Sequence, residues 1–241
     1  ACDMLRVGRA SILLAGGVEE LCVQNFLSFY KLGLLAKEAH GVPPVCRPFH
    51  PRRSGTLLGE GAAFFVLELL EEAQRRNARP YAEVLGYSSA FHPDSMYRYD
   101  PSATSAVQAL QQVLSEAGIR PEAIDYISAC ANATRAADAM EITAIKTVFG
   151  PRASLIPVSA VKSMLGESFS ASAALQLAVT IGAIVRQQVP PTINWNGGDA
   201  EMALDVVPDQ ARSAHVETAL VQSIGFTGTS STLVVRGVSD A

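Results

Sequence analysis

Residues 124–160, IDYISACANATRAADAMEITAIKTVFGPRASLIPVSA, decide the fold class of this chain. Short apolar segments at residues 124–129 and 155–160 predict two strands. The residues between them place apolar side chains at helical spacing, and Gly150 follows at a position where glycine commonly ends a helix. These apolar residues are Met140, Ala144, Ile145 and Val148. A strand, a helix over residues 137–149 and a second strand form the repeating unit of an α/β protein.

The segments on either side continue this alternation. Residues 105–117 and 172–186 have the pattern of helices, and strands are predicted at residues 81–88, 219–224 and 232–236. The part from residue 80 onward therefore reads β-α-β-α-β-α-β-β, which predicts a largely parallel or mixed sheet with helices on both faces. The 172–186 helix has little polar surface, so we expect it to lie buried between layers.

The first 79 residues match only the end of the same pattern. Strands are predicted at residues 11–15, ended by Gly16-Gly17, and at residues 62–69, before a short polar helix. We interpret this as a duplicated fold. Residues 1–79 are the incomplete end of an N-terminal half, and residues 80–241 are a complete C-terminal half.

Composition excludes several classes of protein. The 241 residues are 49% hydrophobic and 17% charged, which is too apolar for a disordered chain. The net charge is −4 and the 19 Lys and Arg residues form no long basic run, so nucleic acid is not an expected partner. The longest apolar stretch, residues 173–185, is shorter than the roughly 20 residues that span a bilayer, and nothing reads as a signal peptide. We expect a cytoplasmic protein without a membrane segment.

The cysteines and histidines of the chain suggest no metal site. The four cysteines are scattered and form no C-x-x-C pair, so neither zinc nor a disulfide scaffold is indicated. The four histidines have no spacing typical of metal ligands or of a catalytic triad, and we expect them at the surface. They are His40, His50, His92 and His215.

Five motifs in order resemble the β-ketoacyl synthase family, which has the thiolase fold. That resemblance implies a layered α-β-α-β-α architecture. The motifs are AGGVE at 15–19, RPF at 47–49 with LGEGA at 58–62, VSAVKSMLG at 158–166, VPPTIN at 189–194 and GFTGTS at 225–230.

The same resemblance implies that catalytic residues of the family are replaced in this chain. Active members use a nucleophilic cysteine and two histidines to condense acyl thioesters with malonyl units. Cys130 stands at the first histidine position, Glu167 at the second, and Thr134 keeps the family's residue type. Cys2 aligns with the end of the helix that the nucleophile begins, so the nucleophile position is expected upstream of residue 1. No intact catalytic set is therefore expected in this chain.

Other family positions are retained. Lys162 matches the lysine below the catalytic histidines, and could equally be a loop lysine paired with an acid. Asp138 and Glu141 match acids that help to hold that lysine and nearby loops, and we interpret them as structural. The resemblance places Phe226, between Gly225 and Gly228, at the gate of the acyl tunnel.

Glu167 and Cys130 each allow two interpretations. Glu167 could act as an acid or base if burial raised its pKa, but a structural carboxylate is favoured. Cys130 could be reactive if it faced Lys162, but a small buried cysteine in the space of a lost imidazole is favoured.

A ketosynthase fold with replaced catalytic residues resembles the chain-length factor (KSβ subunit) of a type II polyketide synthase. That resemblance implies a catalytic KSα-like ketosynthase, the N-terminal half of the fold and an acyl carrier protein as partners. Phosphopantetheine-linked acyl chains would be the substrates, with no covalently bound cofactor. Two alternatives stay open. One is an atypical active synthase, acyltransferase or hydrolase that uses Lys162, Glu167 or Cys130. The other is a degenerate docking domain of a megasynthase.

Overall fold

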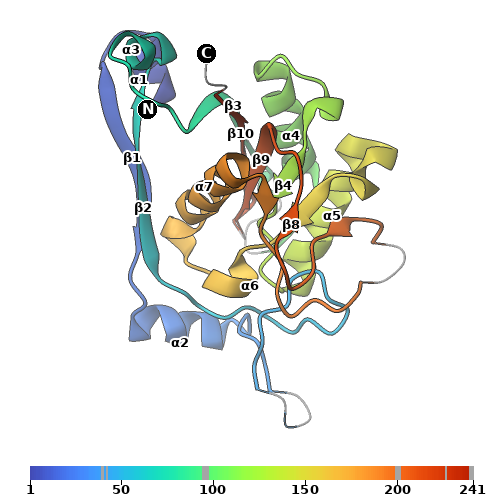
Figure 1. Cartoon of the computed structure of the whole chain (residues 1–241). Coiled ribbons are helices and arrows are strands. Elements are labelled where there is room, and N and C mark those ends of the chain that lie inside the picture. The colour runs from blue at the N-terminus through green and yellow to red at the C-terminus, as the bar shows by residue number, and fades with distance from the viewer. Residues whose placement is uncertain (39–40, 42, 94–97, 199–201, 226, 239–241) are drawn as a thin grey trace.

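The computed structural model in Figure 1 describes residues 1–38, 41, 43–93, 98–198, 202–225 and 227–238. Two β-sheets lie on opposite sides of a central helix. A two-stranded hairpin stands on the left of Figure 1, and a six-stranded mixed sheet with its helices stands on the right.

The described part of the first 75 residues forms this hairpin and the helices that flank its strands in sequence. Strand β1 pairs antiparallel with β2, from Ile12 opposite Glu68 to Glu19 opposite Gly61. Helix α2, which lies between them in sequence, was not predicted, and none of its residues is buried. The elements are α1 (Cys2–Arg6), β1 (Ile12–Glu19), α2 (Val23–Lys31), β2 (Gly61–Glu68) and α3 (Leu70–Arg75).

The prediction that Gly16-Gly17 ends the first strand is wrong, because β1 continues through both glycines. A Cβ on Gly16 would lie 2.1 Å from the Ala63 carbonyl oxygen, and one on Gly17 would lie 2.2 Å from the Ser170 carbonyl oxygen. Gly16 therefore lets β1 approach the backbone at Ala63 closely, and Gly17 does the same at Ser170. The two glycines do not form a turn.

The second part follows the predicted strand and helix order. The six-stranded sheet has the order β3-β10-β9-β4-β5-β7, in which β4 runs parallel to β5 and β9, and β10 runs antiparallel to β3 and β9. The predicted elements are β3 (Ala82–Phe91), α4 (Thr104–Glu116), β4 (Tyr126–Ser128), α5 (Arg135–Phe149), β5 (Pro157–Ser159), α7 (Phe169–Arg186), β9 (Thr218–Ile224) and β10 (Thr229–Gly237). The additional short elements are η2 (Pro121–Ala123), η3 (Gly150–Ser154), α6 (Lys162–Leu165), β6 (Gln188–Val189), β7 (Asp205–Val206) and β8 (Arg212–Ser213).

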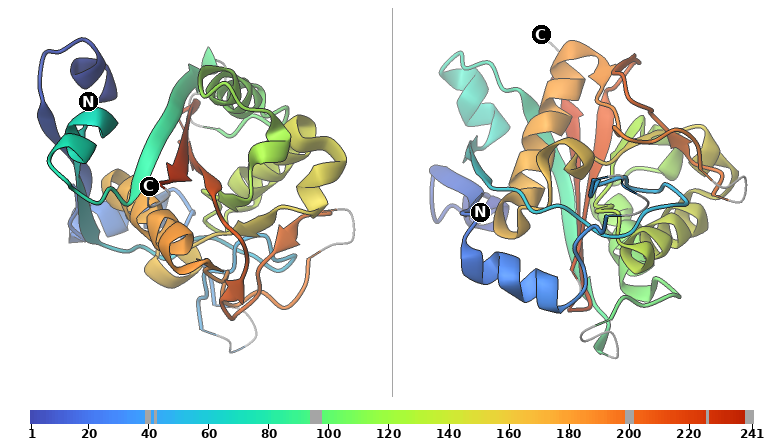
Figure 2. Two further views of the ribbon diagram at one scale, coloured as in Figure 1. Left: turned by 45° about the horizontal axis from the view of Figure 1, so that its top comes forward. Right: turned by 90° about the horizontal axis from the view of Figure 1, so that it is seen from below.

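Helix α7 lies between the two sheets, as its apolar sequence predicted. It packs against β1 and β2 on one side and against β9 and β10 on the other, while α4 packs on the opposite face of the large sheet (Figure 2). Within the described residues α7 is the one helix with the length and hydropathy of a membrane span, at a mean hydropathy of 1.5 over 18 residues. Its place between two sheets accounts for that composition as a core helix.

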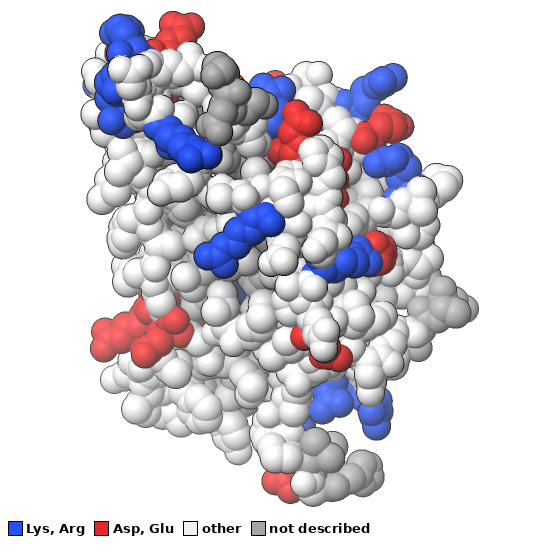
Figure 3. Space-filling model, in the orientation of Figure 1, with Lys and Arg blue, Asp and Glu red and all other residues white. Residues whose placement is uncertain are grey.

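The outer face of the hairpin is apolar and uncovered. Its large side chains alternate with those that face α7, as the two-residue period of a strand requires. In Figure 3, where the hairpin is seen edge-on at the left, its visible edge is uncharged between a basic group over α1 and α3 and an acidic group at the lower end. The exposed side chains of this outer face are Ile12, Leu14, Val18, Phe64 and Val66.

Candidate functional site

The candidate site lies where the parallel strands β4 and β5 end. Ile127 is opposite Val158 in these strands, and Ala129 N donates to the Ser159 carbonyl oxygen at 2.9 Å just beyond them. The loops that leave neighbouring parallel strands at the same edge lie side by side. This brings Cys130, after β4, next to Lys162, which begins α6 after β5.

Cys130 is a buried thiol with polar neighbours. Its Sγ accepts hydrogen bonds from Ile224 N at 3.1 Å and from Lys162 Nζ at 3.3 Å. Burial raises the pKa of Cys130, and the positive charge of Lys162 only partly offsets that effect. The thiol is therefore protonated at neutral pH, which makes it a poor nucleophile.

Lys162 and Glu167 form a buried ion pair, with Nζ 2.8 Å from Oε2. Burial opposes the charge of Lys162, but the Cys130 sulfur and the Glu167 carboxylate outweigh it and hold the pKa of Lys162 above its usual value. Burial likewise works to raise the pKa of Glu167. The charge of Lys162 and three hydrogen bonds outweigh it, so the pKa of Glu167 lies below its usual value. The condition for Glu167 to act as an acid or base, a pKa raised by burial, is not met.

Two neutral side chains complete the surroundings of Glu167. Asn132 Nδ2 donates to Oε2 at 3.0 Å, and Ser172 Oγ donates to Oε1 at 2.7 Å. Sequence reasoning gave neither residue a role. The available signal was position, because Asn132 lies in the turn that contains Cys130 and Ser172 lies on the helix that follows Glu167.

Asp138 joins the turn after β4 to the loop that contains Phe49. Its Oδ1 accepts the backbone N–H groups of Asn132 and Ala133, each at 3.1 Å, and its Oδ2 accepts Phe49 N at 2.8 Å. Arg53 Nε lies 3.2 Å from the same Oδ2. Burial raises the pKa of Asp138 to about 6 against these stabilising contacts, so the carboxylate is ionised at neutral pH.

Glu141 sits one turn further along α5, facing Cys130. Its Oε1 accepts Cys130 N at 2.7 Å, and its buried Oε2 has no hydrogen-bond partner among the described residues. Burial raises the pKa of Glu141 to about 8, so this carboxyl is mostly protonated at neutral pH. Asp138 and Glu141 thus hold the backbone of the loops, whereas Lys162 has Glu167 and Cys130 as its hydrogen-bond partners.

The remaining predicted site positions lie around these groups. Thr134 precedes α5 and donates its hydroxyl to Asn132 Oδ1 at 2.8 Å. Gly225 and Gly228 form the turn between β9 and β10, directly after the Ile224 that contacts Cys130, and Gly228 has a φ of +90°. Phe226 lies outside the described residues, so its place at an acyl gate stays a prediction.

The expectation that all four histidines are at the surface is wrong for His50, which is only 4% exposed. Its Nε2 lies 2.6 Å from Asn196 Oδ1, and its Nδ1 accepts Arg52 N at 2.9 Å. The Phe49 N–H bond to Asp138 draws this loop onto α5 and thereby buries the ring. His215 is exposed, and His40 lies outside the described residues.

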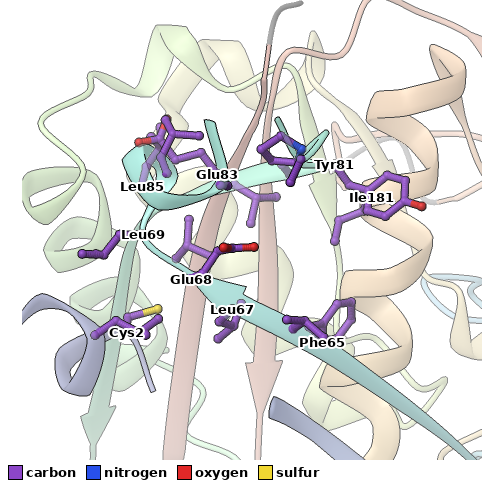
Figure 4. A pocket seen from close by; sticks show the side chains of 18 of the residues that line it. Cys2, Phe65, Leu67, Glu68, Leu69, Tyr81, Glu83, Leu85 and Ile181 are labelled. Carbon is purple, nitrogen blue, oxygen red and sulfur yellow. The ribbon is translucent and has the colours of Figure 1, made fainter. Parts of the chain in front are cut away.

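A hollow of about 670 Å³ lies apart from the candidate site, between the hairpin and the large sheet. Figure 4 shows side chains that line it, including Phe65 and Leu67 from β2, Glu83 from β3 and Ile181 from α7. Cys130, Lys162 and Glu167 do not line it. Among the described residues no group of three or more His, Cys, Asp or Glu side chains could hold a metal ion.

Two family models match this chain. The model "Beta-ketoacyl synthase, N-terminal domain" matches residues 1–73, and "Beta-ketoacyl synthase, C-terminal domain" matches residues 81–196. The chain therefore belongs to the β-ketoacyl synthase family and carries sequence from both of its domains.

Among curated relatives, 3-oxoacyl-[acyl-carrier-protein] synthase 2 of Coxiella burnetii is 38% identical over all of this chain and 58% of its own length. The oxytetracycline polyketide putative beta-ketoacyl synthase 1 of Streptomyces rimosus is 35% identical over 98% of this chain and 56% of its own length. The chain thus spans less than two thirds of the length of these relatives.

Solved structures confirm the thiolase-like α/β fold. A ketosynthase from a type II polyketide synthase, in complex with its acyl-carrier protein and bound to the hexaketide, matches with a TM-score of 0.94 and 36% identity. That match covers 98% of this chain and 59% of the other. The ishigamide ketosynthase/chain length factor matches with a TM-score of 0.88 and 37% identity, over 99% of this chain and 57% of the other.

Proposed function

We propose that this chain belongs to a ketosynthase-like subunit of a type II polyketide or fatty-acid-like synthase, which does not condense acyl units by itself. It would shape the acyl tunnel, and so the chain length, together with a catalytic KSα-like partner in the cytoplasm. The observation that carries the proposal is the buried Lys162–Glu167 ion pair beside the protonated Cys130 thiol. Both histidine positions of the family are filled by groups that are not poised for that chemistry.

Three features of the site support this proposal. A general base is effective when its pKa lies near the working pH, whereas the donors around Glu167 hold its pKa below the usual value of a glutamate. A histidine that stabilises a developing oxyanion is a hydrogen-bond donor, whereas a carboxylate only accepts. Lys162 could donate, but two of its three ammonium N–H groups already bond to Glu167 and Cys130.

The proposed partners are the catalytic ketosynthase, the N-terminal half of the fold and an acyl carrier protein that presents phosphopantetheine-linked acyl chains. The ketosynthase/chain length factor and the carrier-protein complex among the similar structures support this assignment. The division at residues 79 and 80, and the roles of Gly225, Phe226 and Gly228 at the tunnel, are part of the same proposal.

Reconstitution tests this function. A catalytic ketosynthase and its carrier protein are supplied with malonyl units, with and without the protein that carries this chain, and products are identified by mass spectrometry. We expect products of defined length only when this subunit is present. The same product distribution without it would contradict the proposal.

A second candidate is an atypical acyltransferase that uses Cys130. The contact between Lys162 Nζ and Cys130 Sγ favours it, because a neighbouring cation can stabilise a thiolate. A thiol-directed acyl probe distinguishes the two. Labelling of Cys130, with loss of turnover in Cys130→Ala, would support this enzyme. Labelling confined to the less buried Cys2 and Cys22 would exclude it.

A further inference from the structure

The carboxylate of Glu167 is bound like a ligand. Three donors from three separate segments surround it: Lys162 and Asn132 both donate to Oε2, and Ser172 donates to Oε1. The two oxygens of this buried carboxylate thus accept hydrogen bonds from one cation and two neutral donors. Charge-assisted bonds of this kind are the stronger class of hydrogen bond.

The donors are held in place by contacts other than those to Glu167. Asn132 Oδ1 accepts both the N–H and the hydroxyl of Thr134, at 3.1 and 2.8 Å, which fixes the amide with Nδ2 toward the carboxylate. Asp138 holds Asn132 N, and Cys130 Sγ accepts a second bond from Lys162. Ser172 Oγ accepts Ser168 N at 3.1 Å.

The backbone of Glu167 is fixed separately as well. Glu167 N donates to the Leu57 carbonyl oxygen at 2.7 Å, and Gly59 N donates to the Glu167 carbonyl oxygen at 3.0 Å. Shortening the side chain would therefore leave both the backbone and the three donors where they are. The result would be a polar cavity with a net positive charge.

We propose that Lys162, Asn132 and Ser172 form a binding site for a small carboxylate, and that Glu167 occupies it as an internal ligand. This inference extends the proposed function, and its significance for a synthase depends on that function. An occupied carboxylate site beside Cys130 is closed to the carboxylate of an incoming substrate. The ligand class is a monocarboxylate, because the site offers donors for two oxygens and one positive charge.

Acetate is the matching probe. Glu167→Ala removes the atoms beyond Cβ, which are one methylene and one carboxylate, and an acetate ion supplies the same groups. Acetate that binds only the folded protein raises its stability by mass action. We expect Tm of Glu167→Ala to rise by about 2–4 °C when acetate is present at about five times its Kd, relative to chloride at equal ionic strength.

Matched controls separate this site from general salt effects. The wild-type protein and Glu167→Gln should show no acetate-specific rise, because their side chains fill the site. Asp205→Ala removes a carboxylate from the partly exposed pair with Arg212 and should not respond either. Acetamide, which is neutral, should fail to stabilise Glu167→Ala.

The donor set is tested by a second substitution. Adding Ser172→Ala to Glu167→Ala removes one bond to the charged ligand, so the acetate concentration for half-maximal stabilisation should rise about tenfold or more. An unchanged concentration would contradict the assignment of Ser172 to the site.

If Glu167→Ala does not fold in chloride, it is refolded in acetate and in chloride side by side. Recovery in acetate alone supports the proposal. Failure in both salts, no acetate-specific shift, or an equal shift in Asp205→Ala overturns it. These readouts measure stability and not decarboxylation, so the inference and the proposed function can fail independently.

Discussion

Helix α7 separates two antiparallel strand pairs that are covered to very different extents by neighbouring elements. Pair β9–β10 continues into β4 on one side and β3 on the other, and α4 covers the face opposite α7. Pair β1–β2 has no further strand in the described chain and has α7 on one face. Leu220 in β9 is 0% exposed, whereas Leu14 in β1 is 67% exposed.

The comparison teaches that burial here follows from neighbours more than from residue type. Strands β9 and β10 include several Ser and Thr residues and are largely core, whereas the more apolar pair β1–β2 is half surface. In the covered part of the molecule, which is the large sheet with its helices and loops, even charged groups are buried, namely Lys162, Glu167 and Asp138. Substitutions on the covered side should therefore be costly, and equivalent substitutions on the exposed side should be nearly neutral.

The largest expected effect is at the buried ion pair. Lys162→Met leaves the Glu167 carboxylate buried without its cation, which should lower the free energy of unfolding by about 3–5 kcal/mol. Arg75→Met removes an exposed partner of Glu72 and should cost about 0–1 kcal/mol. Urea denaturation of both variants measures the difference. Equal losses would show that the site is not the well-covered region described.

The next effect compares one residue type in two strands. Leu220→Ala opens a cavity in the core and should cost about 2–5 kcal/mol. Leu14→Ala removes an already exposed side chain and should change stability by less than about 0.5 kcal/mol. Thermal and urea unfolding report both values. A large loss at Leu14 would mean that something covers the outer face of the hairpin in solution.

A smaller effect depends on pH. Burial raises the pKa of Glu141 to about 8, above its ordinary value of 4.5 in the unfolded chain. The folded state therefore keeps a proton that the unfolded state releases. The stability that this proton contributes is fully present below pH 4.5 and is lost as pH rises to about 8.

Glu141→Gln cannot ionise, so its stability relative to the wild type should increase between pH 5 and 8, by about 3 kcal/mol. The difference between the two unfolding curves cancels the other titrating groups that both proteins share. A difference that stays constant across this range would contradict a raised pKa at Glu141.

Much of the fold could be predicted from the sequence. The helices and strands of residues 80–241 have clear apolar periodicity, so their order was predictable. Helix α2 was missed although Val23, Phe26, Leu27 and Tyr30 are apolar at helical spacing, so its sequence signal was present and was overlooked. The glycines in β1 were misread as a turn, because a close approach to Ser170 on α7 leaves no local signal.

The site was predictable only in part. The motif alignment identified Cys130, Lys162 and Glu167, which the structure brings into contact. The partners Asn132 and Ser172 come from the fold, since neither has a distinctive spacing. His50 was misplaced because its partner Asn196 lies 146 positions away in sequence. Contacts of this range depend on how the loops pack against one another.

The most direct test of the central claim is decarboxylation of malonyl-carrier protein by the protein that carries this chain, without a catalytic partner. Release of labelled carbon dioxide is measured against a protein-free blank, with an active ketosynthase as the positive control. With Glu167 paired to Lys162 and Cys130 protonated, we predict no release above the blank. Release above the blank that is lost in Glu167→Gln or Cys130→Ala would contradict a non-catalytic site.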